Sequence, residues 1–101
     1  MKWNIGYLEI VEEWLDALPK DHLKSISKKL ALLECCGNKL KLPHSRALGG
    51  GVFELRDVRF GMRLYYCFRE KEEIVILHGG GKKGQEKDID TARELLKKIT
   101  R

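Results

Sequence analysis

The fold is decided by residues 53–68, which read FELRDVRFGMRLYYCF. Apolar and polar side chains alternate on both sides of the turn-like segment 57–61, and this is the period of a β-strand. The pattern predicts two strands, 53–56 and 62–68. One face carries Phe53, Leu55, Met62, Leu64, Tyr66 and Phe68, and the other carries Glu54, Arg56, Arg63, Tyr65, Cys67 and Arg69. Because the apolar face must be covered, we expect Arg56, Arg63 and Tyr65 to point outward together.

A third strand is predicted at 74–78. Both faces of this strand are apolar, with Ile74 and Ile76 on one and Val75 and Leu77 on the other. This composition indicates a central or covered strand, and it leaves the side taken by His78 open. The three predicted strands form an antiparallel meander.

Helices are predicted both before and after the strands along the chain. Apolar residues recur at helical spacing over 6–18, and Pro19 ends the run. A second helix is expected from Asp21, as its N-cap, to Gly37 and Asn38, which supply left-handed C-terminal geometry. Residues 38–51 are predicted to be an irregular loop, and a third helix is expected over 87–100. The sequence thus predicts one α+β domain over 1–101 in the order ααβββα, with room for a short first strand at 2–5.

The chain has 101 residues, 43% hydrophobic and 35% charged, which is the composition of a globular domain. No apolar run approaches the ~20 residues of a membrane span, and the start of the chain lacks the features of a signal peptide. We therefore expect a cytoplasmic protein. Cys35, Cys36 and Cys67 are an odd number without CxxC spacing, which indicates reduced thiols. No metal site and no cofactor are expected.

The net charge of +5 is concentrated in two segments. Residues 39–69 hold seven basic residues against two acidic ones, and residues 82–101 hold seven against four. Clustered positive charge favours a phosphate-rich partner, and an ordinary solvated surface is the alternative. The candidate RNA-binding residues are Lys39, Lys41, Arg46, Arg59 and His78.

The segment 78–84 reads HGGGKKG. It lacks the spacing and the hydroxyl residue of a Walker loop, so nucleotide binding is not expected. We expect a mobile loop that holds Lys82 and Lys83 at a strand end, close to the face of Arg56 and Arg63. A flexible, solvated lysine pair is the alternative.

Residues 46–56, RALGGGVFELR, followed by GMRLYY at 61–66, resemble the RelE/ParE superfamily. More narrowly, the chain is similar to the HigB-like, phage-related toxins of type II toxin–antitoxin modules. Their pattern runs L-G-x-G-L/V-x-E-L-R, then G-x-x-R-x-x-Y/F, then L-H-x-F-x-K-K, whose counterpart here is residues 77–83. The chain departs from this pattern at Gly80, where an aromatic residue is usual, and the departure predicts a more flexible loop.

The resemblance implies a RelE-like fold, in which two N-terminal helices pack on a twisted antiparallel sheet. It implies a metal-independent endoribonuclease that enters the ribosomal A site and cleaves mRNA, with a cognate antitoxin that is often a helix-turn-helix protein. The catalytic residues that it implies are Arg56, Arg63, Tyr65, Lys82 and Lys83. Tyr65 is preferred to Tyr66 because only Tyr65 shares the arginine face. Two alternatives stay open: a non-catalytic, ParE-like gyrase inhibitor, and a degenerate toxin retained only for antitoxin binding.

Overall fold

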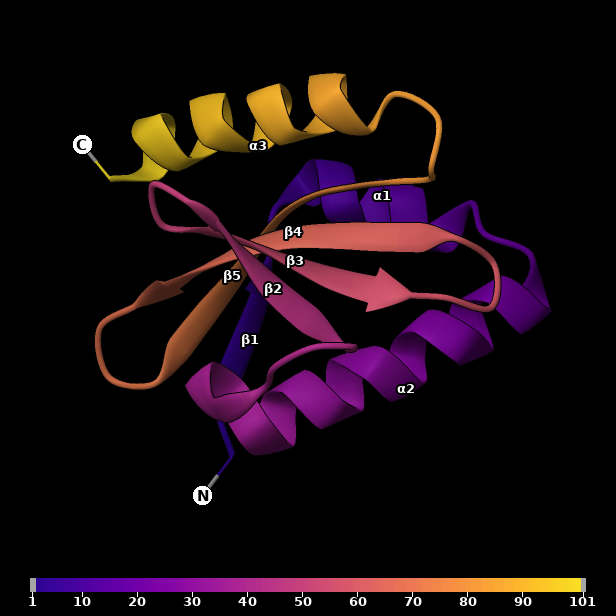
Figure 1. Cartoon of the computed structure of the whole chain (residues 1–101), viewed down its shortest axis with the longest axis horizontal. Coiled ribbons are helices and arrows are strands. Elements are labelled where there is room, and N and C mark those ends of the chain that lie inside the picture. The colour runs from indigo at the N-terminus through magenta and orange to yellow at the C-terminus, as the bar shows by residue number, and fades with distance from the viewer. Residues whose placement is uncertain (1, 101) are drawn as a thin grey trace.

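A five-stranded sheet with helices on both faces organises the chain, as the computed structural model of residues 2–100 shows (Figure 1). In chain order the elements are β1 (Asn4–Tyr7), α1 (Glu9–Asp16), α2 (Lys20–Cys36), the short 3-10 helix η1 (Gly37–Lys39), β2 (Ser45–Gly49), β3 (Val52–Asp57), β4 (Met62–Arg69), β5 (Glu73–Gly80) and α3 (Gln85–Ile99). The strand order is β1-β5-β4-β3-β2, with β1 parallel to β5 and the other pairs antiparallel. The α+β class is confirmed, and the sheet is larger than predicted.

Two strands account for the difference. Segment 38–51, predicted as an irregular loop, contains η1 and β2, which pairs with β3. Gly50 and Gly51 form the turn of this hairpin with φ of 65° and 88°, the positive values at both positions that a two-residue hairpin turn favours. At the other edge, the first strand lies at 4–7 rather than 2–5. Because residues 4–7 pair with β5, the first helix begins at Glu9 and not at residue 6.

The ends of the other helices also differ in detail from the prediction. Helix α2 begins at Lys20 with Pro19 as its N-cap residue, so the prediction of Asp21 as the cap is wrong. Asp21 lies in the first turn, where its carboxylate accepts a hydrogen bond from the His22 backbone N–H. Gly37 has the predicted positive φ, 53°, but its ψ of −127° lies outside the left-handed helical region. Helix α3 begins at Gln85, two residues before the predicted start.

Apolar side chains are buried on both faces of the sheet. On the face covered by α1 and α2 the buried residues are Val11, Ile26, Leu30, Leu33, Leu55, Met62, Leu64, Tyr66, Ile74 and Ile76. On the face covered by α3 they are Val52, Tyr65, Cys67, Val75, Leu77 and Ala92. Strand β5 contributes to both sets, which explains why its sequence is apolar on both faces. All three cysteines are free thiols. None of the described helices is long and apolar enough to cross a membrane.

A β-bulge determines the side on which His78 lies. The register between β4 and β5 shifts between Tyr65 and Tyr66, which pair with His78 and Ile76 and leave Leu77 as the extra residue. Leu77 packs in the cluster under α3, and the His78 ring is stacked parallel to Tyr65 on that same side. The bulge therefore turns two consecutive side chains toward α3.

Replacing Gly37 by alanine is expected to destabilise the fold by about 2–4 kcal/mol, since it combines a left-handed backbone with overpacking. A Cβ at this position would lie 1.9 Å from Nε1 of Trp3. Gly81→Ala is the matched control, because a Cβ there meets nothing within 4 Å. Guanidinium denaturation of both variants measures the effect, and equal midpoints would contradict it.

Candidate nucleic-acid interface

Two rows of side chains cross β3, β4 and β5 on the face toward α3. Backbone register pairs Glu54 with Tyr65 and Tyr65 with His78, and it pairs Arg56 with Arg63 and Arg63 with Gly80. Arg56 and Arg63 are thus direct cross-strand neighbours on one face, as the alternation predicts. The polar row consists of Glu54, Tyr65 and His78, and the arginine row consists of Arg56 and Arg63. The two rows are adjacent, so the charge of Glu54 interacts with those of the arginines.

The Glu54 carboxylate lies at the centre of this face and is completely buried. Its Oε1 atom is 3.2 Å from Nε of Arg46 and 3.6 Å from Nε of Arg56, and its Oε2 atom is 3.5 Å from Nε of Arg63. The side-chain amide of Gln85, the first residue of α3, donates a hydrogen bond of 2.8 Å to Oε2. Three guanidinium groups thus surround one carboxylate, which leaves the cluster with an excess of positive charge.

Exposure differs among the three arginines. The side chain of Arg46 is 45% exposed, that of Arg56 is 35% exposed and that of Arg63 is 11% exposed. Arg63 donates one long hydrogen bond, 3.4 Å from Nη1 to the Gly61 carbonyl oxygen. Guanidinium groups carry five donors, so each of these arginines keeps N–H groups for a further acceptor.

Of the three side chains predicted to point outward, only Arg56 is substantially exposed: Arg63 is buried on this face, and Tyr65 does not point outward, so the prediction is wrong for these two. The Tyr65 side chain is completely buried beneath α3, in the same cluster as Leu77 and Ala92. The outward face was expected to be open because only two helices were placed on the sheet, whereas α3 packs its own apolar stripe on the second face. Stacking of a nucleotide on Tyr65 is therefore excluded in this conformation.

The Tyr65 hydroxyl is buried without a hydrogen-bond partner in the described part of the chain. Burial, together with the carboxylates of Glu54 and Asp88, raises the pKa of Tyr65 to about 12, while Arg63 and Arg46 act in the opposite direction. The phenol stays protonated at neutral pH.

His78 makes a polar contact with α3. Its Nε2 atom is 3.0 Å from Oδ1 of Asp88, and its Nδ1 atom is buried without a partner among residues 2–100. Gly80 is required for this contact, because a Cβ there would lie 2.1 Å from Oδ2 of Asp88. Gly79 and Gly80 belong to β5. The prediction that Gly80 makes the loop more flexible is therefore wrong, since the glycine makes room for a carboxylate.

The two lysines after β5 have different surroundings. The stem of Lys82 lies against Gly61, where a Cβ would be 3.4 Å from its Cγ atom, and the Gly61 carbonyl accepts the Arg63 hydrogen bond. Lys82 is thus at the Arg63 end of the arginine row. Lys82 and Lys83 are both exposed, and neither makes a hydrogen bond or ion pair within the described residues. The two lysines differ in that the stem of Lys82 lies against Gly61.

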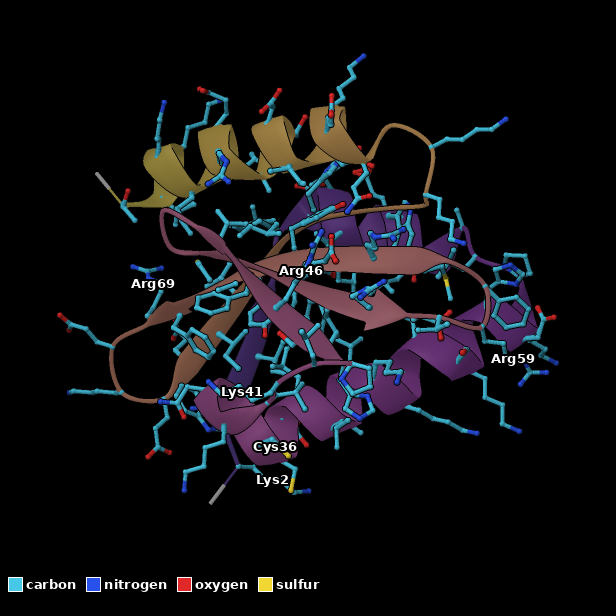
Figure 2. All side chains as sticks on the ribbon, viewed as in Figure 1. Lys2, Cys36, Lys41, Arg46, Arg59 and Arg69 are labelled. Atoms are coloured by element: carbon cyan, nitrogen blue, oxygen red, sulfur yellow. The ribbon has the colours of Figure 1, made fainter. Side chains whose placement is uncertain are left out.

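Three of the proposed RNA-binding residues lie away from the arginine cluster. Figure 2 shows Arg46 over the sheet, Lys41 near the C-terminal end of α2, and Arg59 at the opposite end of the molecule from Arg69. Arg59 lies over the Phe60 ring at 5.1 Å, in the turn between β3 and β4. Lys39 lines a separate surface hollow with Trp3 and Glu72. Of the predicted RNA-binding set, Arg46 and His78 belong to the site.

Three residues of α3 that contact this region were not identified from the sequence. Gln85 binds Glu54, Asp88 binds His78, and Arg93 donates hydrogen bonds of 3.0 and 2.8 Å to the carbonyl oxygens of Leu48 and Gly49. Their helix was predicted, but its position over the second face was not. Within residues 2–100, no three His, Cys, Asp or Glu side chains gather in a way that could hold a metal ion.

Solved structures with the same architecture include bacterial and archaeal RelE toxins. A mutant of the Escherichia coli toxin RelE in the free state superposes with a TM-score of 0.72 at 17% identity, covering 98% of this chain and 99% of that one. The Mycobacterium tuberculosis toxin–antitoxin complex RelBE2 gives 0.63 at 20%, covering 81% and 100%. The RelE–RelB complex of Pyrococcus horikoshii gives 0.59 at 19%, covering 82% and 98%. The fold is that of the RelE toxins.

The family model described as phage-derived protein, Gp49-like, matches residues 13–97, and the chain belongs to this family. Family and fold together confirm the resemblance to the phage-derived branch of the RelE/ParE superfamily. A comparison with curated proteins gives no match.

Tyr65→Phe is expected to leave the free energy of unfolding at pH 7 unchanged or slightly higher, because it removes a buried hydroxyl without a partner. Tyr66→Phe is the matched comparison: it is expected to lose about 1–3 kcal/mol, since it leaves the buried Ser45 hydroxyl unpaired. Urea denaturation measures both. Equal losses would show that the Tyr65 hydroxyl has a partner.

Ionisation of the Tyr65 phenol makes the free energy of unfolding fall at alkaline pH. Because the pKa of Tyr65 is raised in the folded state from 10.0 to about 12, its contribution is complete below pH 10 and is lost as the pH rises through 12. The wild-type protein should therefore lose stability between pH 10 and 12 more steeply than Tyr65→Phe.

Proposed function

We propose that the protein is the toxin of a type II toxin–antitoxin module and that it inhibits translation by cleaving mRNA on the ribosome. The observation that carries this proposal is the cluster of Arg46, Arg56 and Arg63 around a single carboxylate on one sheet face. Such an excess of guanidinium groups suits a polyanion, because each can bind a phosphate through two parallel hydrogen bonds. The RelE fold supports a toxin rather than another RNA-binding protein.

The proposed reaction is an in-line attack of a ribose 2′-hydroxyl on the adjacent phosphorus. The P–O bond to the 5′ oxygen breaks, a proton leaves the 2′-hydroxyl and another is delivered to the departing 5′ oxygen. Arg56 and Arg63 bind the non-bridging oxygens and stabilise the charge of the phosphorane-like transition state. Lys82, at the Arg63 end of the row, adds positive charge there, and Lys83 contributes to longer-range attraction of RNA.

The proposed role of Tyr65 changes with its burial. Its ring is nearly parallel to that of His78, and the two ring centroids are 6.5 Å apart. In this position it supports the strands that carry Arg63 and Glu54 and does not contact a nucleotide. Arg46 extends the positive face toward the edge strand, and Arg59, Lys39 and Lys41 are proposed to contact RNA outside the cleavage site.

The proposed partners are a cognate antitoxin, of the helix-turn-helix type that the sequence resemblance implies, and the ribosomal A site with its mRNA. Support for the antitoxin comes from the structural neighbours: the Mycobacterium tuberculosis and Pyrococcus horikoshii structures are toxin–antitoxin complexes, and another holds an E. coli RelE mutant with an antitoxin peptide. Co-expression with the product of an adjacent short reading frame tests this pairing by co-purification.

A non-catalytic gyrase inhibitor is the second candidate, and one observation favours it. One nitrogen of the His78 imidazole contacts Asp88 and the other is buried, so neither is open to a substrate. A gyrase supercoiling assay run beside a translation-dependent mRNA cleavage assay separates the two functions. Growth arrest on expression without antitoxin separates both from a degenerate toxin.

Arg63→Ala is expected to lower the rate of ribosome-dependent mRNA cleavage on the order of a hundredfold, since it removes a contact worth ~3 kcal/mol in the transition state. Arg69→Ala is the control: it removes an equally basic residue that pairs with Glu73, away from the cluster. Primer extension on programmed ribosomes measures cleavage, and circular dichroism verifies folding. Wild-type cleavage by a folded Arg63→Ala protein would remove this residue from the mechanism.

Lys82→Ala should reduce cleavage more than Lys83→Ala. Both lysines are exposed, but the stem of Lys82 packs against Gly61, whose carbonyl oxygen accepts a hydrogen bond from Arg63. The two variants have the same net charge, so their RNA affinities at low salt should fall equally. Equal losses of cleavage rate would indicate that the pair acts only through long-range charge.

A further inference from the structure

A buried carboxylate in the middle of a phosphate-binding face is unexpected, because it repels the ligand and loses its hydration. Glu54 is completely buried, and four donors from β2, β3, β4 and α3 converge on it. It has no surface through which to touch RNA. Its action on any substrate must therefore pass through the residues that it binds.

The three ion pairs share one geometric feature. In each of Arg46, Arg56 and Arg63 the nitrogen nearest to Glu54 is Nε, the inner nitrogen of the guanidinium group. The terminal Nη groups, which form the forked end that binds a phosphate, are left for other acceptors. Among the described residues, the weak bond from Arg63 to the Gly61 carbonyl is the one hydrogen bond that these Nη groups make.

Without Glu54 the arginines would repel one another. Arg56 and Arg63 are directly opposite in register, and like charges in that position are destabilising. Arg46 is opposite Glu54 itself. Glu54 neutralises one charge of the three. It accepts a hydrogen bond from Nε of Arg46, while Nε of Arg56 and of Arg63 lie within ion-pair distance of it at 3.6 and 3.5 Å, and Nε of Arg63 makes no hydrogen bond to the described residues. Gln85 donates to its second oxygen and links the arrangement to α3.

We propose that Glu54 is a positioning residue: its buried carboxylate holds three guanidinium groups by Nε so that their terminal nitrogens form a preorganised site for one RNA phosphate. This inference rests on the proposed cleavage function and specifies how its arginines are oriented. Preorganised donors stabilise the transition state more than mobile ones because they do not have to be ordered during the reaction.

Glu54→Gln tests the proposal, since it keeps the shape of the side chain and removes its charge. Single-turnover cleavage on programmed ribosomes should slow on the order of tenfold to a hundredfold, as expected for misplaced catalytic groups. Binding of a short single-stranded RNA should be unchanged or tighter at low salt, with a steeper salt dependence, because net positive charge rises by one. Glu54→Asp, which keeps the charge on a shorter side chain, should restore part of the rate.

The arginine Nε–Hε signals in an ¹⁵N NMR spectrum give a readout that does not depend on catalysis. In the wild-type protein, the Arg46 signal should be shifted by its hydrogen bond to Glu54, and the signal of the buried Arg63 Nε–H should be slow to exchange with solvent. In Glu54→Gln, the signals of all three arginines should move toward those of exposed arginines. Glu73→Gln is the matched control, because it removes a carboxylate paired with Arg69 outside the site. It should alter the Arg69 signal and leave cleavage unchanged.

Each other outcome overturns a specific statement. If Glu54→Gln cleaves like Glu73→Gln, or if its binding and rate fall together in proportion to unfolded protein, the positioning role is wrong. A change in the shape of the pH–rate profile would make Glu54 a proton-transfer group instead. If the wild-type protein cleaves no mRNA but the three Nε–Hε signals depend on Glu54, the proposed function fails while the orientation of the arginines stands.

Discussion

The pairing of β3 with β4 is the constraint on which the rest of the structure depends. Its register aligns Leu55 with Leu64 toward α1 and α2, and it aligns Arg56 with Arg63 toward α3. A shift of one residue would exchange the two faces and bury the arginines in the larger core, so apolar burial and charge presentation are fixed together. The register that buries the apolar side chains therefore also sets the positions of Arg56 and Arg63.

Burial of Glu54 changes what the arginine face can do. A buried ion pair often contributes little to stability, because desolvation offsets the attraction, but removing one partner leaves uncompensated charge. Here the partners are three guanidinium groups, and their sum remains positive. The cluster therefore contains one anion and keeps a net positive charge, which is the property that the proposed phosphate-binding site requires.

Helix α3 connects the site to the fold through polar contacts as well as apolar ones. Gln85 binds Glu54, Asp88 binds His78, and Arg93 binds the last two residues of β2. The same helix buries Tyr65, so the tyrosine supports the sheet instead of meeting a ligand. Gly80 leaves room for the Asp88 carboxylate, which a Cβ at this position would meet.

The sequence by itself determined the three central strands, the three helices and the common face of Arg56 and Arg63, because these follow from local periodicity and from side-chain alternation. It did not reveal β2, whose pairing is with another strand and whose own pattern is weak. It also could not place α3 over the second face or bring Gln85 to Glu54, since such contacts join residues far apart in the chain. Tertiary structure alone decided which polar groups are buried, because burial depends on what packs above a residue and not on its neighbours in sequence.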